Sequence, residues 1–234
     1  MVILRDDARI QKLKRRSQQL SLIGFLFLAA GLVILFLPLE NPFIFQTLAL
    51  ITGWIVSQIG IHLSHRYARS PRPDEILDDA VKGVARDGRM YHFLLPAPHV
   101  LLTRSGPIVF VLKFQTGEIS VTEDKWKQKG IGFRRFFGQE GLGNPAKEAE
   151  TMIESLANYI RKYAPDVEEL DIGAMIVFTS KNIKSLDVKN STIPAMHYSK
   201  VKGFLRHKSQ GDPLDKKDYS ALQAAFDQAA VDLL

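Results

Sequence analysis

Residues 17–65 hold two long apolar runs, and Glu40 is the only Lys, Arg, Asp or Glu among them. A charged side chain at the centre of a bilayer costs roughly 2.5 to 3.5 kcal/mol. About 20 apolar residues in a helix are enough to cross the ~30 Å hydrocarbon layer. We therefore predict a hairpin of two membrane-spanning helices, over residues 19–38 and 43–64. A short turn with a proline at each end joins them.

Two other interpretations of these runs are a cleaved signal peptide and a buried helix of a soluble protein. A signal peptide has an apolar stretch of about 7 to 15 residues before a small-residue cleavage site. The first run is longer and lacks that site. The second run carries four polar side chains that favour a buried helix, namely Gln46, Thr52, Gln58 and His62. Because the two runs follow each other so closely, we favour the membrane hairpin.

Basic residues flank the hairpin on both sides, and the turn has none. Residues 1–16 form a basic N-terminal arm, and Arg66, Arg69 and Arg72 follow the second run. Since Lys and Arg near span ends are retained in the cytoplasm, we expect a multi-pass protein of the inner cell membrane. Its N-terminus and its C-terminal domain then both face the cytoplasm, and the absence of cysteine agrees with a reducing compartment. The arm also attracts anionic lipid head groups, but we favour a role in fixing topology.

The remainder consists of a linker over residues 66–73, stiffened by prolines, and one domain over residues 74–234. From residue 66 onward the chain holds 25 of the 31 Lys and Arg and 22 of the 25 Asp and Glu, a net charge of +3. This balance is not the charge signature of a nucleic-acid-binding protein.

Hydrophobic patterning in this domain predicts a mixed α/β fold. A helix from Glu75 is followed by strand-like runs that suggest an antiparallel meander, at 90–95, 99–103, 108–114 and 118–122. Asn144 and Pro145 then open a second helix. Further strands and an amphipathic C-terminal helix complete the domain.

The stretch from about Glu75 to Thr179 resembles a NERD domain, the nuclease-related domain of the restriction-endonuclease-like superfamily. The resemblance rests on the helix from Glu75, the hairpin FLLPAPHVLLTRSGPIVFVLKFQTGEISV, Trp126 after it, NPAKEAE at a helix start and IVFTS as a later strand. It implies a NERD-like domain with a mixed or antiparallel sheet flanked by helices.

The resemblance also implies a site, but a degenerate one. Active members of the superfamily hold a divalent metal with an aspartate at the start of one strand and an acid two residues before a lysine on the next. Here the lysine matches Lys113, but the acid matches Val111 and the aspartate matches Pro98 or His99. The family's glutamine on the second helix matches Glu148. Lys113 is then a catalytic remnant, and we expect no metal and no cofactor because valine cannot bind Mg²⁺.

The alternative is a rearranged Mg²⁺ site that uses Glu118, Glu123 or Asp124 with acids of the helix starts. Each of these acids also has a simpler role at a strand end, in a turn or in a first helical turn. Lys113 likewise fits the exposed side of an alternating strand. His99 is a further candidate as a metal ligand or base beside Lys113, but the six histidines show no zinc-site spacing.

Basic and aromatic residues alternate in the segment KWKQKGIGFRRFFG, which spans residues 125–138 and is expected to form a loop. Such a loop binds nucleic acid by backbone contacts and stacking, or lies against the inner leaflet; we favour the leaflet because the membrane is close. In a third interpretation its aromatic side chains fold back onto the core. The candidate binding residues are Lys125, Trp126, Lys127, Lys129, Arg134, Arg135 and Phe136.

Taken together, the sequence predicts a membrane-tethered NERD-like module without catalytic activity. We expect it to contact the lipid bilayer and to bind a protein partner, a nucleic acid or the inner membrane surface. The alternative function is a divalent-metal-dependent nuclease with a rearranged active site. The sequence does not define the oligomeric state.

Overall fold

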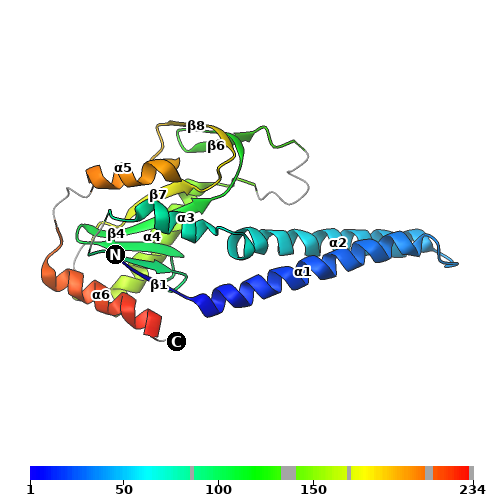
Figure 1. The fold of residues 1–234 in the computed structure, drawn as a ribbon, viewed down its shortest axis with the longest axis horizontal. Coiled ribbons are helices and arrows are strands. Elements are labelled where there is room, and N and C mark those ends of the chain that lie inside the picture. The colour runs from blue at the N-terminus through cyan, green and yellow to red at the C-terminus, as the bar shows by residue number, and fades with distance from the viewer. Residues whose placement is uncertain (85–86, 133–140, 168–169, 209–212, 232–234) are drawn as a thin grey trace. The chain divides into compact units, whose positions relative to one another are not determined.

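The computed structural model describes residues 1–234 with five gaps, at 85–86, 133–140, 168–169, 209–212 and 232–234. The chain forms two compact units. One unit contains the helical segment Asp7–Arg72. The other is an α/β domain made of Met1–Asp6 and the chain from Pro73 onward, apart from Gly132–Glu140. Figure 1 labels most of the elements of both units.

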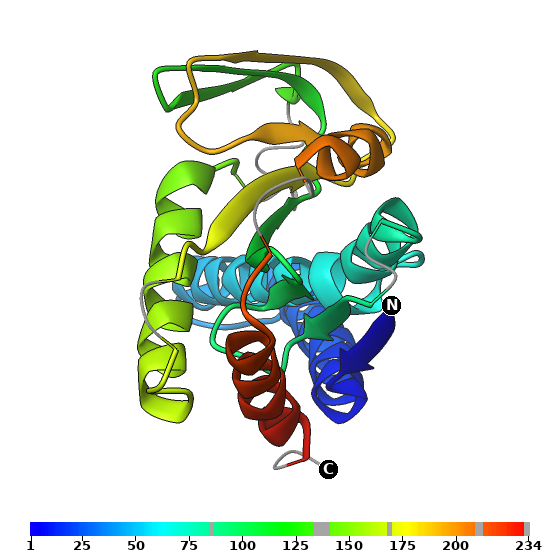
Figure 2. The same ribbon diagram turned by 90° about the vertical axis from the view of Figure 1, so that its left-hand side faces the viewer.

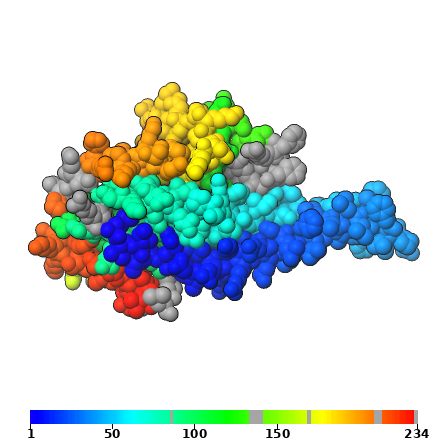
Figure 3. Space-filling model, in the orientation of Figure 1, coloured from blue at the N-terminus to red at the C-terminus, as the bar shows by residue number. Residues whose placement is uncertain are grey.

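The helical unit consists of α1 (Asp7–Ile34), α2 (Pro42–Leu63) and a π-helical turn, η1 (Ser64–Ala68). Both long helices are apolar and long enough to cross a membrane. The bounds of α2 agree with the predicted span to one residue. Helix α1 begins twelve residues before its predicted span, so most of the basic arm is helical. The two helices lie side by side along their length in Figure 3.

Small residues line the contact between α1 and α2. A Cβ atom added to Gly24 would lie 2.3 Å from Ser57 Oγ and 2.7 Å from the backbone nitrogen of Ser57. One added to Gly53 would lie 2.9 Å from the backbone nitrogen of Leu28, and one added to Gly60 would lie 2.7 Å from that of Ser21. The two backbones therefore approach closely enough that any side chain at these glycines clashes, which is how helices pack within lipid.

Large apolar side chains of the hairpin point away from this contact. Only Ile10, Ser17, Gly24, Gly31, Gly53 and Gly60 are buried on the two helices. The exposed side chains include Phe25 (63 %), Leu32 (60 %), Phe43 (73 %) and Ile44 (59 %). This distribution, small residues inside and large apolar residues outside, is the reverse of a water-soluble helical pair.

The domain is built on a six-stranded mixed sheet in the order β1-β2-β3-β4-β7-β9. Its strands are β1 (Val2–Arg5), β2 (Arg89–His92), β3 (His99–Thr103), β4 (Gly106–Lys113), β7 (Gly173–Phe178) and β9 (Ala195–His197). Strands β2, β3 and β4 form the predicted antiparallel meander, and β7 pairs parallel to β4. The predicted mixed α/β fold with helices flanking the sheet is confirmed.

Two helices cover each face of this sheet. Helices α4 (Pro145–Tyr163) and α6 (Lys216–Val231) pack on the face of Tyr91 and Val109, through Leu156 and Phe226 among others. Helices α3 (Pro73–Val81) and α5 (Tyr198–Lys208) cover the opposite face, where Phe110 is buried. Figure 2 shows α4 on one side of the strands and α3 and α5 on the other.

Polar contacts also fasten α6 to the sheet. Arg89 donates to both carboxylate oxygens of Asp227, at 2.9 and 2.7 Å, and the hydroxyl of Tyr91 donates to Asp227 Oδ1 at 2.8 Å. Burial, and then the hydrogen bond to Asp227, raise the pKa of Tyr91. The tyrosine therefore stays a hydrogen-bond donor.

Two features of the sheets differ from the sequence prediction. The first six residues do not belong to a free arm, because β1 pairs parallel with β2 at the sheet edge. Residues 118–122 do not continue the meander, because β7 occupies the position beside β4. They lie in β5 (Gly117–Thr122), the centre of a second sheet with β6 (Lys125–Lys129) and β8 (Ile183–Lys189) in the order β6-β5-β8.

The close contact of α1 and α2 predicts the effect of a larger side chain there. Replacing Gly24 with valine forces the helices apart and lowers the stability of the hairpin by about 1 to 3 kcal/mol. The matched control is Ala30→Val, which adds bulk on an exposed position of the same helix. Unfolding of the full chain in mixed micelles by titration with a denaturing detergent measures both changes. Equal effects of the two substitutions would contradict the packing described above.

Candidate functional site

Lys113, the predicted catalytic remnant, is the last residue of β4 and is buried, with 4 % of its surface exposed. The expectation that it lies on the exposed side of its strand is therefore wrong. Its neighbours Val109 and Val111 face α4, whereas Phe110 faces α3 and α5. Lys113 follows the same alternation and points toward the start of α4.

The ammonium group of Lys113 has two oxygen partners. It donates to Glu148 Oε1 at 2.6 Å and to the carbonyl oxygen of Leu142 at 3.1 Å. Glu148 lies in the first turn of α4, where Asn144 caps the helix by accepting a hydrogen bond from the backbone nitrogen of Lys147 at 3.2 Å. Because a buried ammonium group is costly without partners, this ion pair is what makes the position of Lys113 tolerable.

Val111 is the residue that the sequence resemblance aligns with a metal-holding acid. Only 1 % of its surface is exposed, and it packs in an apolar cluster with Leu142, Ala149 and Ile176. Beside it, Gln115 donates to the carbonyl oxygen of Gly141 at 3.2 Å. The side chains here connect β4 to the segment before α4, and among the described residues they bring one acid, Glu148, to the lysine.

Among the acids considered for a rearranged site, Asp124 has a defined structural role. Its Oδ1 accepts hydrogen bonds from Ser191 Oγ and from the backbone nitrogen of Thr192, both at 3.1 Å. These bonds tie the turn between β5 and β6 to the segment after β8. Within the described ranges, no three His, Asp or Glu side chains converge in an arrangement suited to a metal ion.

His99 does not lie beside Lys113. It shares its side of β3 with Leu101, which packs against α3, so the two residues occupy opposite faces of the sheet. Its Nδ1 lies 2.9 Å from Nδ1 of His92, and Nε2 of His92 lies 2.8 Å from Asp78 Oδ1. His92 is fully buried and His99 is 8 % exposed.

This histidine pair belongs to a larger polar network that the sequence does not predict. Arg5 of β1 contacts Asp74, with Nε 3.0 Å from Oδ2, and also donates to Asp78. The side chain of Asp74 is fully buried and that of Asp78 is 13 % exposed. The network therefore joins β1, which precedes α1, to α3, which follows the helical unit. Its partners are far apart in sequence, which is why local patterns do not reveal it.

The basic and aromatic segment is not a loop at its start, because residues 125–129 form strand β6. Lys125, Lys127 and Lys129 are exposed, whereas the ring of Trp126 packs toward the core with its centroid 6.1 Å from that of Phe178. For this tryptophan the structure agrees with the fold-back interpretation. The candidate residues Arg134, Arg135 and Phe136 lie outside the described residues.

One acid lies opposite the lysines of this face. Glu118 is the ladder partner of Lys129, whereas Lys125 and Lys127 lie opposite Thr122 and Ser120. In the described part of the chain, these two lysines form no ion pair. The face therefore presents two cations in a row on an edge strand.

Comparisons of the chain with protein-family models, with curated proteins and with solved structures find no match.

The network around Asp78 predicts a large loss of stability when that carboxylate is removed. Asp78→Ala leaves Arg5 and His92 without a shared acceptor and lowers the free energy of unfolding by about 2 to 4 kcal/mol. Asp79→Ala is the matched control, because Asp79 is exposed on the same helix and changes stability by less than about 0.5 kcal/mol. Urea unfolding of the detergent-solubilised full chain, followed by circular dichroism, compares the two variants. A loss equal to that of the control would show that the network is not stabilising.

Proposed function

We propose that this chain is a membrane-anchored binding module. In this proposal α1 and α2 form a transmembrane hairpin, and the α/β domain is a NERD-like, catalytically inactive scaffold at the inner membrane surface. The observation that carries the proposal is the ion pair of the buried Lys113 with Glu148, whose side chain is 40 % exposed, near Val111. It favours a structural role for the one lysine that matches a nuclease motif.

The hairpin supports the membrane part of the proposal in three ways. Both helices have the length and apolarity of a span. Glycine and serine bring the two backbones close together, Leu28 and Leu50 pack on the glycines, and most of the other large apolar side chains point outward. The basic residues at 1–16 and at Arg66, Arg69 and Arg72 favour a cytoplasmic location of both ends by the positive-inside rule.

The order of elements supports the NERD-like scaffold. The helix from Glu75 that carries the resemblance lies in α3, and the hairpin corresponds to β3 and β4, followed by β5. The NPAKEAE segment opens α4, and the IVFTS segment includes the end of β7. On this scaffold the acids needed for hydrolysis have no counterparts, since a hard cation requires carboxylate oxygens that Val111 does not offer.

A binding surface is available on the second sheet. Lys125 and Lys127 are exposed and have no acid opposite them in the ladder. Their charge favours an anionic partner, and a domain tethered to the membrane meets the anionic inner leaflet most often. We therefore propose that this face contacts the membrane surface or a partner bound there.

A nuclease assay tests the catalytic part of the proposal. We expect the full chain with Mg²⁺ or Mn²⁺ to leave single- and double-stranded DNA intact. We expect Lys113→Ala to act on stability instead, lowering the free energy of unfolding by about 2 to 3 kcal/mol because Glu148 and Leu142 lose their partner. Lys184→Ala, at an exposed lysine of β8, is the control and changes the free energy of unfolding by less than about 0.5 kcal/mol.

Metal-dependent cleavage that Lys113→Ala abolishes would instead establish the rearranged nuclease. DNA retained without cleavage and released steeply by salt would assign the basic face to nucleic acid.

Labelling of single cysteines tests the topology. The chain has no cysteine of its own, so Leu39→Cys in the turn and Lys217→Cys in α6 each provide one reactive thiol. In right-side-out membrane vesicles, a membrane-impermeant maleimide is expected to label Leu39→Cys and to reach Lys217→Cys only after the vesicles are opened. Labelling of Lys217→Cys in closed vesicles would reverse the orientation, and extraction of the chain by alkaline carbonate would reject the transmembrane hairpin.

A further inference from the structure

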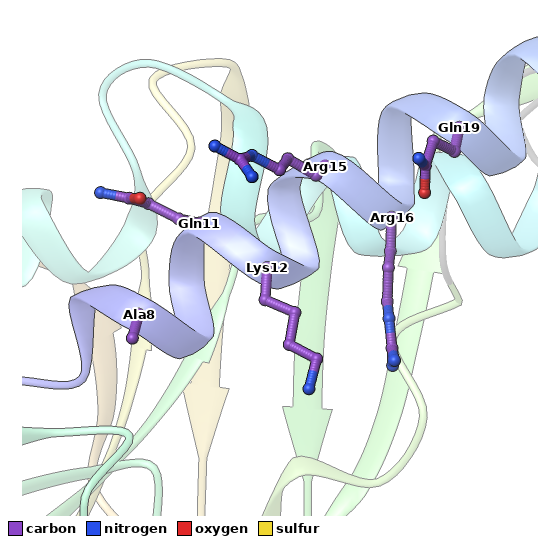
Figure 4. Close-up of a pocket in the computed structure, with 6 residues that line it drawn as sticks. All are labelled: Ala8, Gln11, Lys12, Arg15, Arg16 and Gln19. Carbon is purple, nitrogen blue, oxygen red and sulfur yellow. The ribbon is translucent and has the colours of Figure 1, made fainter. Parts of the chain in front are cut away.

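A shallow pocket lies on the surface of α1, just before its apolar part. It is lined by side chains from three successive turns of this one helix, namely Ala8, Gln11, Lys12, Arg15, Arg16 and Gln19. In Figure 4, Lys12 and Arg16 point in the same direction, whereas Gln11 and Arg15 point in another. The small side chain of Ala8 leaves room at one end. The pocket thus lies between two rows of polar side chains that can donate hydrogen bonds.

The charges in this pocket are not compensated by the protein. Lys12, Arg15 and Arg16 are all exposed. Within the described ranges, none of the three forms an ion pair or a side-chain hydrogen bond. Three cations on adjacent turns repel one another, so an anion among them is favoured.

The place of the pocket along the helix defines which anion it meets. Arg16 is followed directly by the run that has no charged residue, and the first large apolar side chain is Leu20. At 1.5 Å per residue, the Arg16 and Leu20 positions differ by only about 6 Å along the helix axis. If Leu20 marks the start of the hydrocarbon layer, the pocket lies at the depth of the lipid phosphates.

We propose that this pocket binds the phosphate of an anionic phospholipid of the inner leaflet. The proposal rests on the proposed function, since it requires the hairpin to span the membrane. The two guanidinium groups each offer paired N–H donors that match phosphate oxygens, the ammonium of Lys12 adds a point charge, and the glutamine amides can donate to head-group oxygens. The acyl chains of the lipid then lie along the exposed apolar side chains that follow on α1.

Binding of a short-chain lipid to the detergent-purified full chain tests the site. Native mass spectrometry measures the affinity for dioctanoylphosphatidylglycerol, with dioctanoylphosphatidylcholine as the neutral reference. We expect the anionic lipid to bind at least ~10-fold more tightly than the neutral one. We expect the triple variant Lys12→Gln, Arg15→Gln, Arg16→Gln to weaken binding of the anionic lipid at least ~10-fold, since each basic residue near the membrane surface contributes about 1 kcal/mol.

Two controls separate a site from general attraction. The first control is a triple variant that removes the same charge from exposed positions of the α/β domain, Lys181→Gln, Lys184→Gln, Lys217→Gln. We expect it to change the affinity less than ~2-fold. Arg16→Gln with Gln18→Arg keeps the net charge and nearly the same depth but moves one cation about 200° around the helix, outside the pocket. We expect this relocation to weaken binding at least ~3-fold. Unchanged affinity would overturn the site in favour of diffuse charge attraction.

Inorganic phosphate as a competitor distinguishes the source of the anion. Failure of millimolar phosphate to displace the lipid supports a phospholipid site, and displacement at equal concentrations would overturn it in favour of free phosphate. The carbonate extraction described above tests the hairpin separately. A chain that resists extraction while the triple variant retains the lipid would reject this site and leave the proposed function standing.

Discussion

The contact of Arg5 with Asp74 and Asp78 holds together the two places where the chain leaves and re-enters the α/β domain. Strand β1 ends at Arg5 and α1 begins two residues later, while α3 begins at Pro73, directly after the helical unit. Without the carboxylates, Arg5 would be a charge buried to about four fifths without a partner. The contact adds to the parallel pairing of β1 with β2, and His92 extends the network into the sheet.

The two faces of the large sheet carry different polar contacts. The face toward α3 and α5 carries this ionic network, while the face toward α4 carries Lys113 and its partner Glu148. In both places, charged groups that suggest chemistry in the sequence are engaged in binding other parts of the same chain. The carboxylate and the carbonyl oxygen that accept hydrogen bonds from the buried lysine hold its side chain in one position, and the nearby valine adds apolar contacts.

The sequence was sufficient for the features that arise from local patterns. The lack of charged side chains at 17–39 and 41–65 located the two apolar helices, and an apolar, strand-like run located β3, which matches residues 99–103. Asn144 with Pro145 located the start of α4.

Features that depend on distant pairing were not predictable in this way. The partner of β4 is β7, some sixty residues later, so residues 118–122 were placed in the wrong sheet. The burial of Lys113 does not follow from the strand pattern, because alternation indicates two faces but not that helices cover both of them. The helical contact does have a signal in the sequence, because the glycines recur seven residues apart, at 24 and 31 and at 53 and 60, with Ser21 and Ser57 three or four residues from them.

The position of β1 has a consequence for the order of events during synthesis. Val2 pairs with Arg89, so the first strand is made long before its partner, and the whole helical hairpin emerges in between. The loop that this pairing closes is entropically costly until the rest of the sheet is present to compensate for it. In the proposed transmembrane topology, the N-terminal residues therefore remain unpaired while the hairpin enters the bilayer. Completion of the domain would then require that both ends of the hairpin reach the same side. A hairpin inserted with only one helix across the membrane would leave β1 and β2 on opposite sides, and the sheet would lack its first strand.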